Sequence, residues 1–235
     1  MSTALQTKSR PILFSGDMVR AILRGTKTQT RRLVKSAFLE FGGAGGKNSP
    51  EWNDPTQWGY EHEDGRWSML KPTQPDDHQV PCPYGKQGDL LWVREAVSFT
   101  VGDLMTDRPY TRIPNDRFLE DGRHVTCWYA ADNNRPTWAE TPWHPSIHMP
   151  RWVSRILLKI VDVRVERLCD ITEADAYSEG VTVTEDHRGS PDFDFRNDAR
   201  TAFRHLWERI NGPDSMLINP WVWVIEFKRL RSSHG

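Results

Sequence analysis

The chain has 235 residues, enough to bury a real core, and its 31 basic and 32 acidic side chains leave a formal net charge of −1. A mean hydropathy of −0.67 without any long apolar run excludes a membrane span, and the balanced charge argues against a protein that coats nucleic acid by bulk electrostatics. The N-terminus lacks the apolar core of a signal peptide, so we expect a cytoplasmic protein. Three widely spaced cysteines form neither a CxxC pair nor a zinc motif, which fits a reducing compartment.

The first predicted element is a short amphipathic helix that Asp17 can cap and that ends at Gly25. Its apolar face holds Met18, Val19, Ile22 and Leu23. The sequence then predicts extended structure at residues 28–34, because β-branched residues and an alternating pattern of side chains replace the helical period. The first 36 residues carry eight Lys or Arg and one acidic residue, so this segment is the basic part of an otherwise balanced chain.

A long irregular stretch follows at about residues 41–83, where Gly, Pro, Trp and acidic residues are scattered without a period. We interpret it as an insertion ordered by its tryptophans, within a single domain that covers residues 1–235. Beyond it, the turn signal at Gly88 and Asp89 opens a strand at residues 90–96, which residues 96–101 continue or pair with. A further strand is expected at residues 124–131.

The C-terminal half has the clearest periodicity. Residues 154–168 predict a strand whose phase change at Ile160 and Val161 suggests a bulge or bend. Thr172 opens a capping-box-like helix that ends near Gly180, residues 198–211 form an amphipathic helix, and residues 221–230 form a closing strand. Strands spread along the chain with two or three helices predict an α+β fold built on a small mixed β-barrel with long loop insertions.

Lys27, Thr30 and Arg32 form the first candidate site, directly after the first helix. A hydroxyl becomes a nucleophile when a base takes its proton, and a lysine serves as that base if burial or nearby cations depress its pKa. On a regular strand Thr30 and Arg32 share a face, so Lys27 has to reach them from the turn after Gly25. The same residues would also suit a solvated basic edge strand.

Two more candidates come from later in the chain. Glu179 precedes Gly180 at the end of the short helix and could act as a general acid if desolvated, although glutamates at helix ends usually face solvent. His148, Arg151 and Trp152 lie around a proline and offer a guanidinium and an aromatic ring for a base or a phosphate. The alternative places Trp152 in the core and Arg151 on the surface.

Other familiar signatures are missing from the sequence. It contains no nucleotide-binding glycine loop, no HExxH and no GxSxG. Its eight histidines are dispersed, so we expect neither a metal site nor a cofactor.

Four segments in order resemble the ASCH domain family. They are ILRGTKTQTRR at residues 22–32, GD with the hydrophobic strand at 88–94, ITEADAYSEG at 171–180, and VIEFKRL at 224–230. MPRW and NPWVWVIEF also resemble the longer phage- and prophage-type members. The resemblance spans almost the whole chain and implies a PUA-like β-barrel linked to RNA.

A bacterial branch of that family acts as an N4-acetylcytidine amidohydrolase with a lysine, a threonine and a glutamate as its catalytic set. Carried over by position, the resemblance implies Lys27 as proton acceptor, Thr30 as nucleophile and Glu179 as proton donor to the leaving amine. It implies removal of an acyl group from the N4 amine of a cytidine nucleoside, with Arg32 or backbone N–H groups stabilising the oxyanion. Arg151, Trp152 and His148 are then the further substrate-binding candidates.

Two alternatives remain open from the sequence. Other family members are described as RNA-binding modules, in which Lys27, Arg31, Arg32 and Arg151 would hold phosphates while a tryptophan stacks a base. A third possibility is a metal-independent ribonuclease that uses lysine and arginine to stabilise a charged intermediate. The expected partner is accordingly a modified cytidine nucleoside or RNA.

Overall fold

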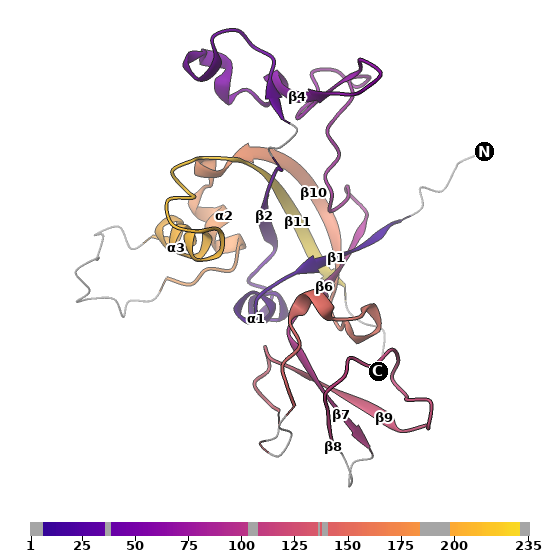
Figure 1. Cartoon of the computed structure of the whole chain (residues 1–235). Coiled ribbons are helices and arrows are strands. Elements are labelled where there is room, and N and C mark those ends of the chain that lie inside the picture. The colour runs from indigo at the N-terminus through magenta and orange to yellow at the C-terminus, as the bar shows by residue number, and fades with distance from the viewer. Residues whose placement is uncertain are drawn as a thin grey trace. The chain divides into compact units, whose positions relative to one another are not determined.

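The computed structural model describes residues 7–35, 39–102, 108–135, 137, 141–183 and 198–230. This part of the chain folds as a mixed α+β protein with few helices and several sheets (Figure 1). It divides into two compact units, each assembled from separate stretches of sequence. Unit 1 comprises Met1–Lys27, Gln87–Ile160 and Phe227–Gly235, and unit 2 comprises Thr28–Lys86 and Val161–Glu226. The single domain over residues 1–235 stays a prediction.

Unit 1 is mainly β-structure. Its own elements are β1 (Ser9–Leu13), α1 (Gly16–Arg24), β6 (Leu90–Arg94), β7 (Val97–Gly102), β8 (Arg108–Tyr110), β9 (His124–Tyr129), and the 3-10 helices η5 (Ser146–His148) and η6 (Arg151–Val153). β6 pairs in parallel with β1 and antiparallel with the first residues of β10 (Leu157–Arg167). β7 is the central strand of an antiparallel sheet with β8 and β9. The strands predicted at 90–96 and 124–131 are therefore confirmed.

The core of unit 1 gathers on β7. Alternating residues of this strand, Val97, Phe99 and Val101, share one face of the pleat and form an apolar cluster, while Ser98 and Thr100 on the other face are also buried. Val125 from β9 and Met149 from the loop before η6 pack against them. This apolar cluster gives the second sheet a support that a bare three-stranded sheet would lack.

Unit 2 holds the remaining elements. They are β2 (Gln29–Leu33), β3 (Glu40–Phe41), η2 (Gly46–Asn48), η3 (Pro50–Asn53), η4 (Pro55–Gln57), β4 (Trp58–Glu61), β5 (Trp67–Met69), η7 (Leu168–Asp170), α2 (Glu173–Ser178) and α3 (Ala199–Asn211). β11 (Trp221–Leu230) pairs antiparallel with β2 and neighbours β10. β10 enters unit 2 after Ile160, and β11 leaves it after Glu226.

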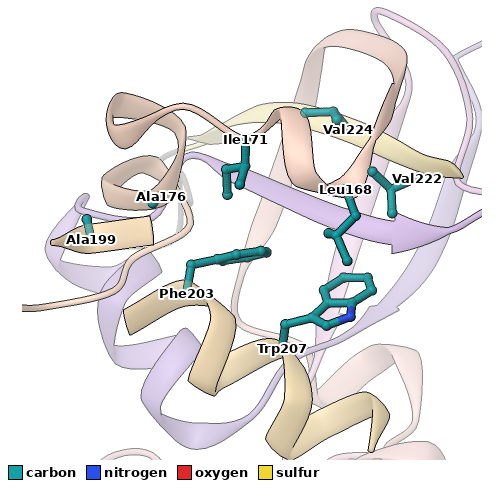
Figure 2. Packing of buried hydrophobic residues seen from close by; sticks show 8 residues of the cluster. All are labelled: Leu168, Ile171, Ala176, Ala199, Phe203, Trp207, Val222 and Val224. Carbon is teal, nitrogen blue, oxygen red and sulfur yellow. The ribbon is translucent and has the colours of Figure 1, made fainter. Parts of the chain in front are cut away.

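The core of unit 2 lies between α2, α3 and β11. Phe203 and Trp207 point from α3 toward Leu168 and Ile171, as Figure 2 shows. The cluster is completed by Ala176, Ala199, Val222 and Val224. The predicted apolar stripe of α3 is thus largely confirmed, but Ile210 is 54% exposed because the last turn extends past the core.

The stretch predicted as irregular has more structure than the sequence suggested. Residues 40–69 contain the antiparallel sheet β3-β4-β5, and Phe41, Trp52 and Trp58 stack with ring centroids 4.6–5.6 Å apart. Trp58 also meets Trp221 of β11 edge to face at 6.3 Å. Two tryptophans of the segment thus pack beside short strands, which carry too few residues to show a period. That the tryptophans order the segment stays a prediction.

Arg167 joins this aromatic cluster to β10. Its guanidinium carbon lies 4.1 Å from the ring centroid of Trp221 and 5.4 Å from that of Trp58. It donates hydrogen bonds to the Trp52 carbonyl oxygen at 2.8 Å and to Asn53 Oδ1 at 3.1 Å. Burial lowers the pKa of Arg167, which is the cost of holding a cation under two indole rings.

Helix boundaries follow the predicted caps with one exception. The N-cap of α1 is Ser15, whose hydroxyl accepts the Met18 N–H, while Asp17 lies in the first turn and pairs with Arg20. Asp17 was the wrong choice because a serine two residues earlier competes for the same cap. Gly25 ends α1 in the left-handed region at φ 80°, where glycine is strain-free.

Among the described residues, no helix combines the length and apolar character that crossing a membrane requires.

Candidate functional site

β2 divides its side chains between two faces. Gln29 and Arg31 point to one face, and Thr30 and Arg32 point to the other, because successive strand residues alternate. In the register with β11, Thr30 lies opposite Ile225 and Arg32 lies opposite Trp223. Thr30 and Arg32 therefore lie in one environment, and Gln29 and Arg31 lie in another.

Thr30 is a buried hydroxyl, only 2% exposed. Just before it, the Thr28 N–H donates to the Ser178 carbonyl oxygen at 2.9 Å. That hydrogen bond ties the start of β2 to the last residue of α2, and Glu179 is the next residue along the chain. The backbone thus brings together two segments that are 150 residues apart in sequence.

Glu179 is the C-cap residue of α2 and is 3% exposed. Its N–H donates to the carbonyl oxygens of Asp175 and Ala176, which fixes the backbone at this point. Its Oε1 lies 3.4 Å from Nη1 of Arg31. A carboxylate at a helix C-terminus is opposed by the helix dipole, and this cation offsets that penalty.

Arg31 is the centre of a buried charged network, and its side chain is fully excluded from solvent. Besides Glu179, its guanidinium contacts Glu166 at 3.0 Å and Asp175 at 3.4 Å. It also donates to Gln29 Oε1 at 2.5 Å. One cation is thus shared by three carboxylates, and none of these pairs uses the two-oxygen fork geometry that gives an arginine pair its full strength.

Arg164 extends the same network along β10. It pairs with Glu166 at 2.5 Å, with Asp175 at 3.4 Å and with Glu226. Burial works against ionisation of Asp175, but hydrogen bonds from Thr172 and Gln29 and the charge of Arg31 outweigh it and lower the pKa of Asp175 to about 2. Asp175 is therefore a fixed negative charge in this network.

Arg32, the predicted substrate-binding residue, is half-buried on the Thr30 face. Burial lowers the pKa of Arg32, while the charges of Tyr84 and Glu179 act in the opposite direction. Two of the predicted site residues, Arg32 and Glu179, therefore interact electrostatically.

Lys27 belongs to unit 1. It is 2% exposed, and its Nζ lies 5.6 Å from the ring centroid of Phe14. Its backbone N–H donates to the Ala21 carbonyl oxygen at 3.2 Å, which continues the turn that ends α1. A solvated basic edge is therefore wrong for Lys27, Thr30 and Arg31, since all three side chains are buried.

The candidates at residues 148–152 also belong to unit 1. Arg151 is exposed, with its guanidinium carbon 5.5 Å from the ring centroid of Trp92, and His148 is exposed as well. Trp152 packs against the β7 core and donates its Nε1–H to the Pro114 carbonyl oxygen at 3.2 Å. This placement matches the alternative in which Trp152 packs and Arg151 faces solvent, and the substrate-binding role of these three residues stays a prediction.

The sequence did not predict the carboxylates that surround Arg31 and Arg164. Glu166, Asp175 and Glu226 were not singled out, although Asp162, Arg164 and Glu166 alternate with apolar residues along β10. Such alternation of charges signals a polar face on a strand. Only the fold shows that this face meets Arg31.

The described residues include no group of three or more His, Cys, Asp or Glu side chains arranged to hold a metal ion. A scan against protein-family models and searches of curated proteins and solved structures return no match to this chain.

Proposed function

We propose that the chain is an ASCH-type amidohydrolase that removes an acyl group from the N4 amine of a cytidine nucleoside. One observation carries the proposal: Lys27, Thr30 and Glu179, which the resemblance implies as the catalytic set, are 2%, 2% and 3% exposed. Lysine and glutamate are almost never buried this far without a specific reason. Exclusion from water is also the condition under which a lysine amine becomes a base and a hydroxyl becomes a useful nucleophile.

Chain connectivity supports the same set. Lys27 is bonded directly to Thr28, whose N–H is held at Ser178 beside Glu179. Three residue steps separate Lys27 from Thr30, so their Cα atoms can be at most about 10 Å apart.

The reaction balances with these three groups alone. The Lys27 amine takes the proton of Thr30 Oγ as that oxygen attacks the acyl carbon, and the C–N bond breaks as the Glu179 carboxylic acid protonates the N4 amine. Water then gives one proton to Glu179 and its oxygen to the acyl carbon. The Thr30–acyl bond breaks, the Lys27 ammonium returns the proton to Thr30 Oγ, and a carboxylic acid leaves.

The proposed proton donor lies in a network of charged side chains. Glu179 is almost fully excluded from water, and its carboxylate lies 3.4 Å from the Arg31 guanidinium, which also contacts Glu166 and Asp175. Asp175 is held as a fixed negative charge, so the mechanism assigns the role of general acid to Glu179 and not to Asp175.

The proposal includes the closed PUA-like barrel and a cytoplasmic, prophage-type member of the family. The sheets formed by the described residues do not close into a barrel. The closed barrel is therefore proposed from the resemblance alone.

Incubation of the full chain with N4-acetylcytidine, followed by chromatography for cytidine and acetate, tests the activity. We expect Lys27→Ala and Thr30→Val each to lower kcat/KM by about 10³-fold or more, because each removes a member of a coupled set. Thr28→Val is the matched control: it makes the same change two residues away at an exposed position and leaves turnover intact. Absence of turnover, or turnover that survives Thr30→Val, overturns the mechanism.

The RNA-binding alternative relies on four cations, Lys27, Arg31, Arg32 and Arg151, and two of them, Lys27 and Arg31, are buried. Arg31 is also held by three carboxylates, which compete with a phosphate. Binding of a single-stranded oligonucleotide at low salt, lost on Arg32→Gln and Arg151→Gln, would instead favour the RNA-binding alternative.

A further inference from the structure

A pocket of about 410 Å³ lies entirely within unit 2, on the same face of β2 and β11 as Thr30. Alternation places Val34 on the Thr30 and Arg32 face of β2, and the register places Trp223 on that face of β11. Nothing in the proposed reaction uses this pocket. Its volume is within the range of small-molecule sites, about 300–1,000 Å³.

The walls of the pocket are held by hydrogen bonds. At its floor the Val34 N–H donates to the Trp221 carbonyl oxygen at 3.0 Å. Tyr60 comes from the middle of β4, and Val80 donates its N–H to the Met69 carbonyl oxygen of β5 at 2.8 Å. A pocket built on paired strands exists before a ligand arrives, so little free energy is lost in ordering it.

The chemistry of the lining is simple. Apolar side chains make most of it: Val34, Leu39, Val80, Pro81, Pro83 and Trp223. Two residues with polar groups, Lys35 and Tyr60, join them, and none of the lining residues that the structure describes is acidic. A lone cation on an apolar wall that holds two aromatic rings and two prolines matches a flat apolar body carrying one negative charge.

We propose that this pocket binds a small aromatic organic anion, with its rings among Tyr60, Val80 and Trp223 and its acidic group at Lys35. The inference stands on the pocket alone and does not depend on the proposed hydrolysis. It assigns a role to the segment at residues 39–83, which provides five of the eight lining residues and the Pro and Tyr surfaces.

The test uses 2-naphthoate as the probe, the neutral 2-naphthamide as its uncharged match, and isothermal titration calorimetry on the full chain. We expect saturable one-to-one binding of the acid that is tighter than that of the amide by about 2- to 5-fold, the range of one partly exposed charge pair. This comparison needs no altered protein. Equal affinities for the two compounds would overturn the anionic part of the proposal, and no saturable binding of either would overturn all of it.

Variants then locate the site. Lys35→Gln removes the preference for the acid over the amide, whereas Lys47→Gln, at an exposed lysine outside the lining, keeps it. Val80→Glu places a carboxylate on the apolar wall and weakens naphthoate binding by about 10-fold or more. Far-UV circular dichroism of each variant shows that it is folded. Binding unchanged by both Val80→Glu and Lys35→Gln places the ligand elsewhere and overturns the proposal, whatever the outcome of the acetylcytidine assay.

Discussion

Each unit contains an arginine surrounded by carboxylates: Arg31 in unit 2 is buried and Arg155 in unit 1 is partly exposed, and their contacts are arranged differently. In unit 1, Arg155 holds both oxygens of Glu95 at 2.9 and 3.0 Å and both oxygens of Asp132 at 2.6 and 2.7 Å. In unit 2, Arg31 is shared by three carboxylates at 3.0–3.4 Å. The first arrangement uses the whole guanidinium fork and has the form of a structural clamp. The second holds each carboxylate through a single contact and lacks the geometry of a clamp.

Removal of each arginine is the strongest way to test this difference. Arg31→Met leaves three carboxylates around an uncompensated buried position, so we expect the free energy of unfolding to fall by about 3–5 kcal/mol. Arg155→Met costs less, because the Arg155 side chain is 26% exposed and water can reach the carboxylates it leaves. Urea unfolding of both variants measures the two losses. An equal or larger loss for Arg155→Met would contradict the comparison.

Neutralising one carboxylate in each unit separates catalysis from stability. We expect Glu179→Gln to lower kcat/KM for N4-acetylcytidine by about 100-fold or more, because it removes the proposed proton donor. Its effect on unfolding should stay below about 1 kcal/mol, since Arg31 keeps two other carboxylates. Glu95→Gln, which is the same change in the clamp of unit 1, leaves turnover intact. If Glu95→Gln lowers kcat/KM as much as Glu179→Gln does, the acidic network of unit 2 has no special role.

The two networks also respond to pH with opposite sign. The pKa of Asp175 falls from 3.8 to about 2 on folding, so its contribution is present above about pH 4 and is lost as pH falls toward 2. This shift corresponds to about 2 kcal/mol of stability, which Asp175→Asn removes. Burial raises the pKa of Glu95 even though Arg155 opposes it, so its contribution to stability instead falls as pH rises above 4.5.

Urea midpoints measured between pH 2 and 6 for the wild type, Asp175→Asn and Glu95→Gln report these slopes. The prediction fails if Asp175→Asn keeps the acid-side loss of stability or if Glu95→Gln steepens the fall at higher pH.

Local rules were enough to predict several elements. The closing strand at Trp221–Leu230 has the predicted bounds, because its alternation runs without interruption. The capping box of Thr172 with Asp175 forms as expected, since it needs only residues three apart. Predictions of this kind depend on the neighbours in sequence and not on the rest of the fold.

Features that depend on residues far apart in the sequence could not be predicted from local patterns. The sequence showed Arg31 as one of several basic residues, and only the pairing of β2 with β11 and the position of α2 reveal the carboxylates around it. The strands β3 to β5 were missed because two to four residues cannot show a period. The burial of Lys27, Thr30 and Glu179 could be expected only through the resemblance, since single residues of these types usually face water.

The contacts that Trp221 makes with Arg167 and Trp58 cannot form until late in the synthesis of this segment, because the three residues are far apart in sequence. Trp221 follows Trp58 by 163 residues, so at about 5–20 residues per second the ribosome delivers it some 8–30 s later. Until then Phe41, Trp52 and Trp58 lack the indole ring that covers one side of their cluster. A nascent chain stopped before residue 221 therefore exposes aromatic surface to chaperones and aggregation, and this exposure ends only when Trp221 has been added and has packed on Trp58.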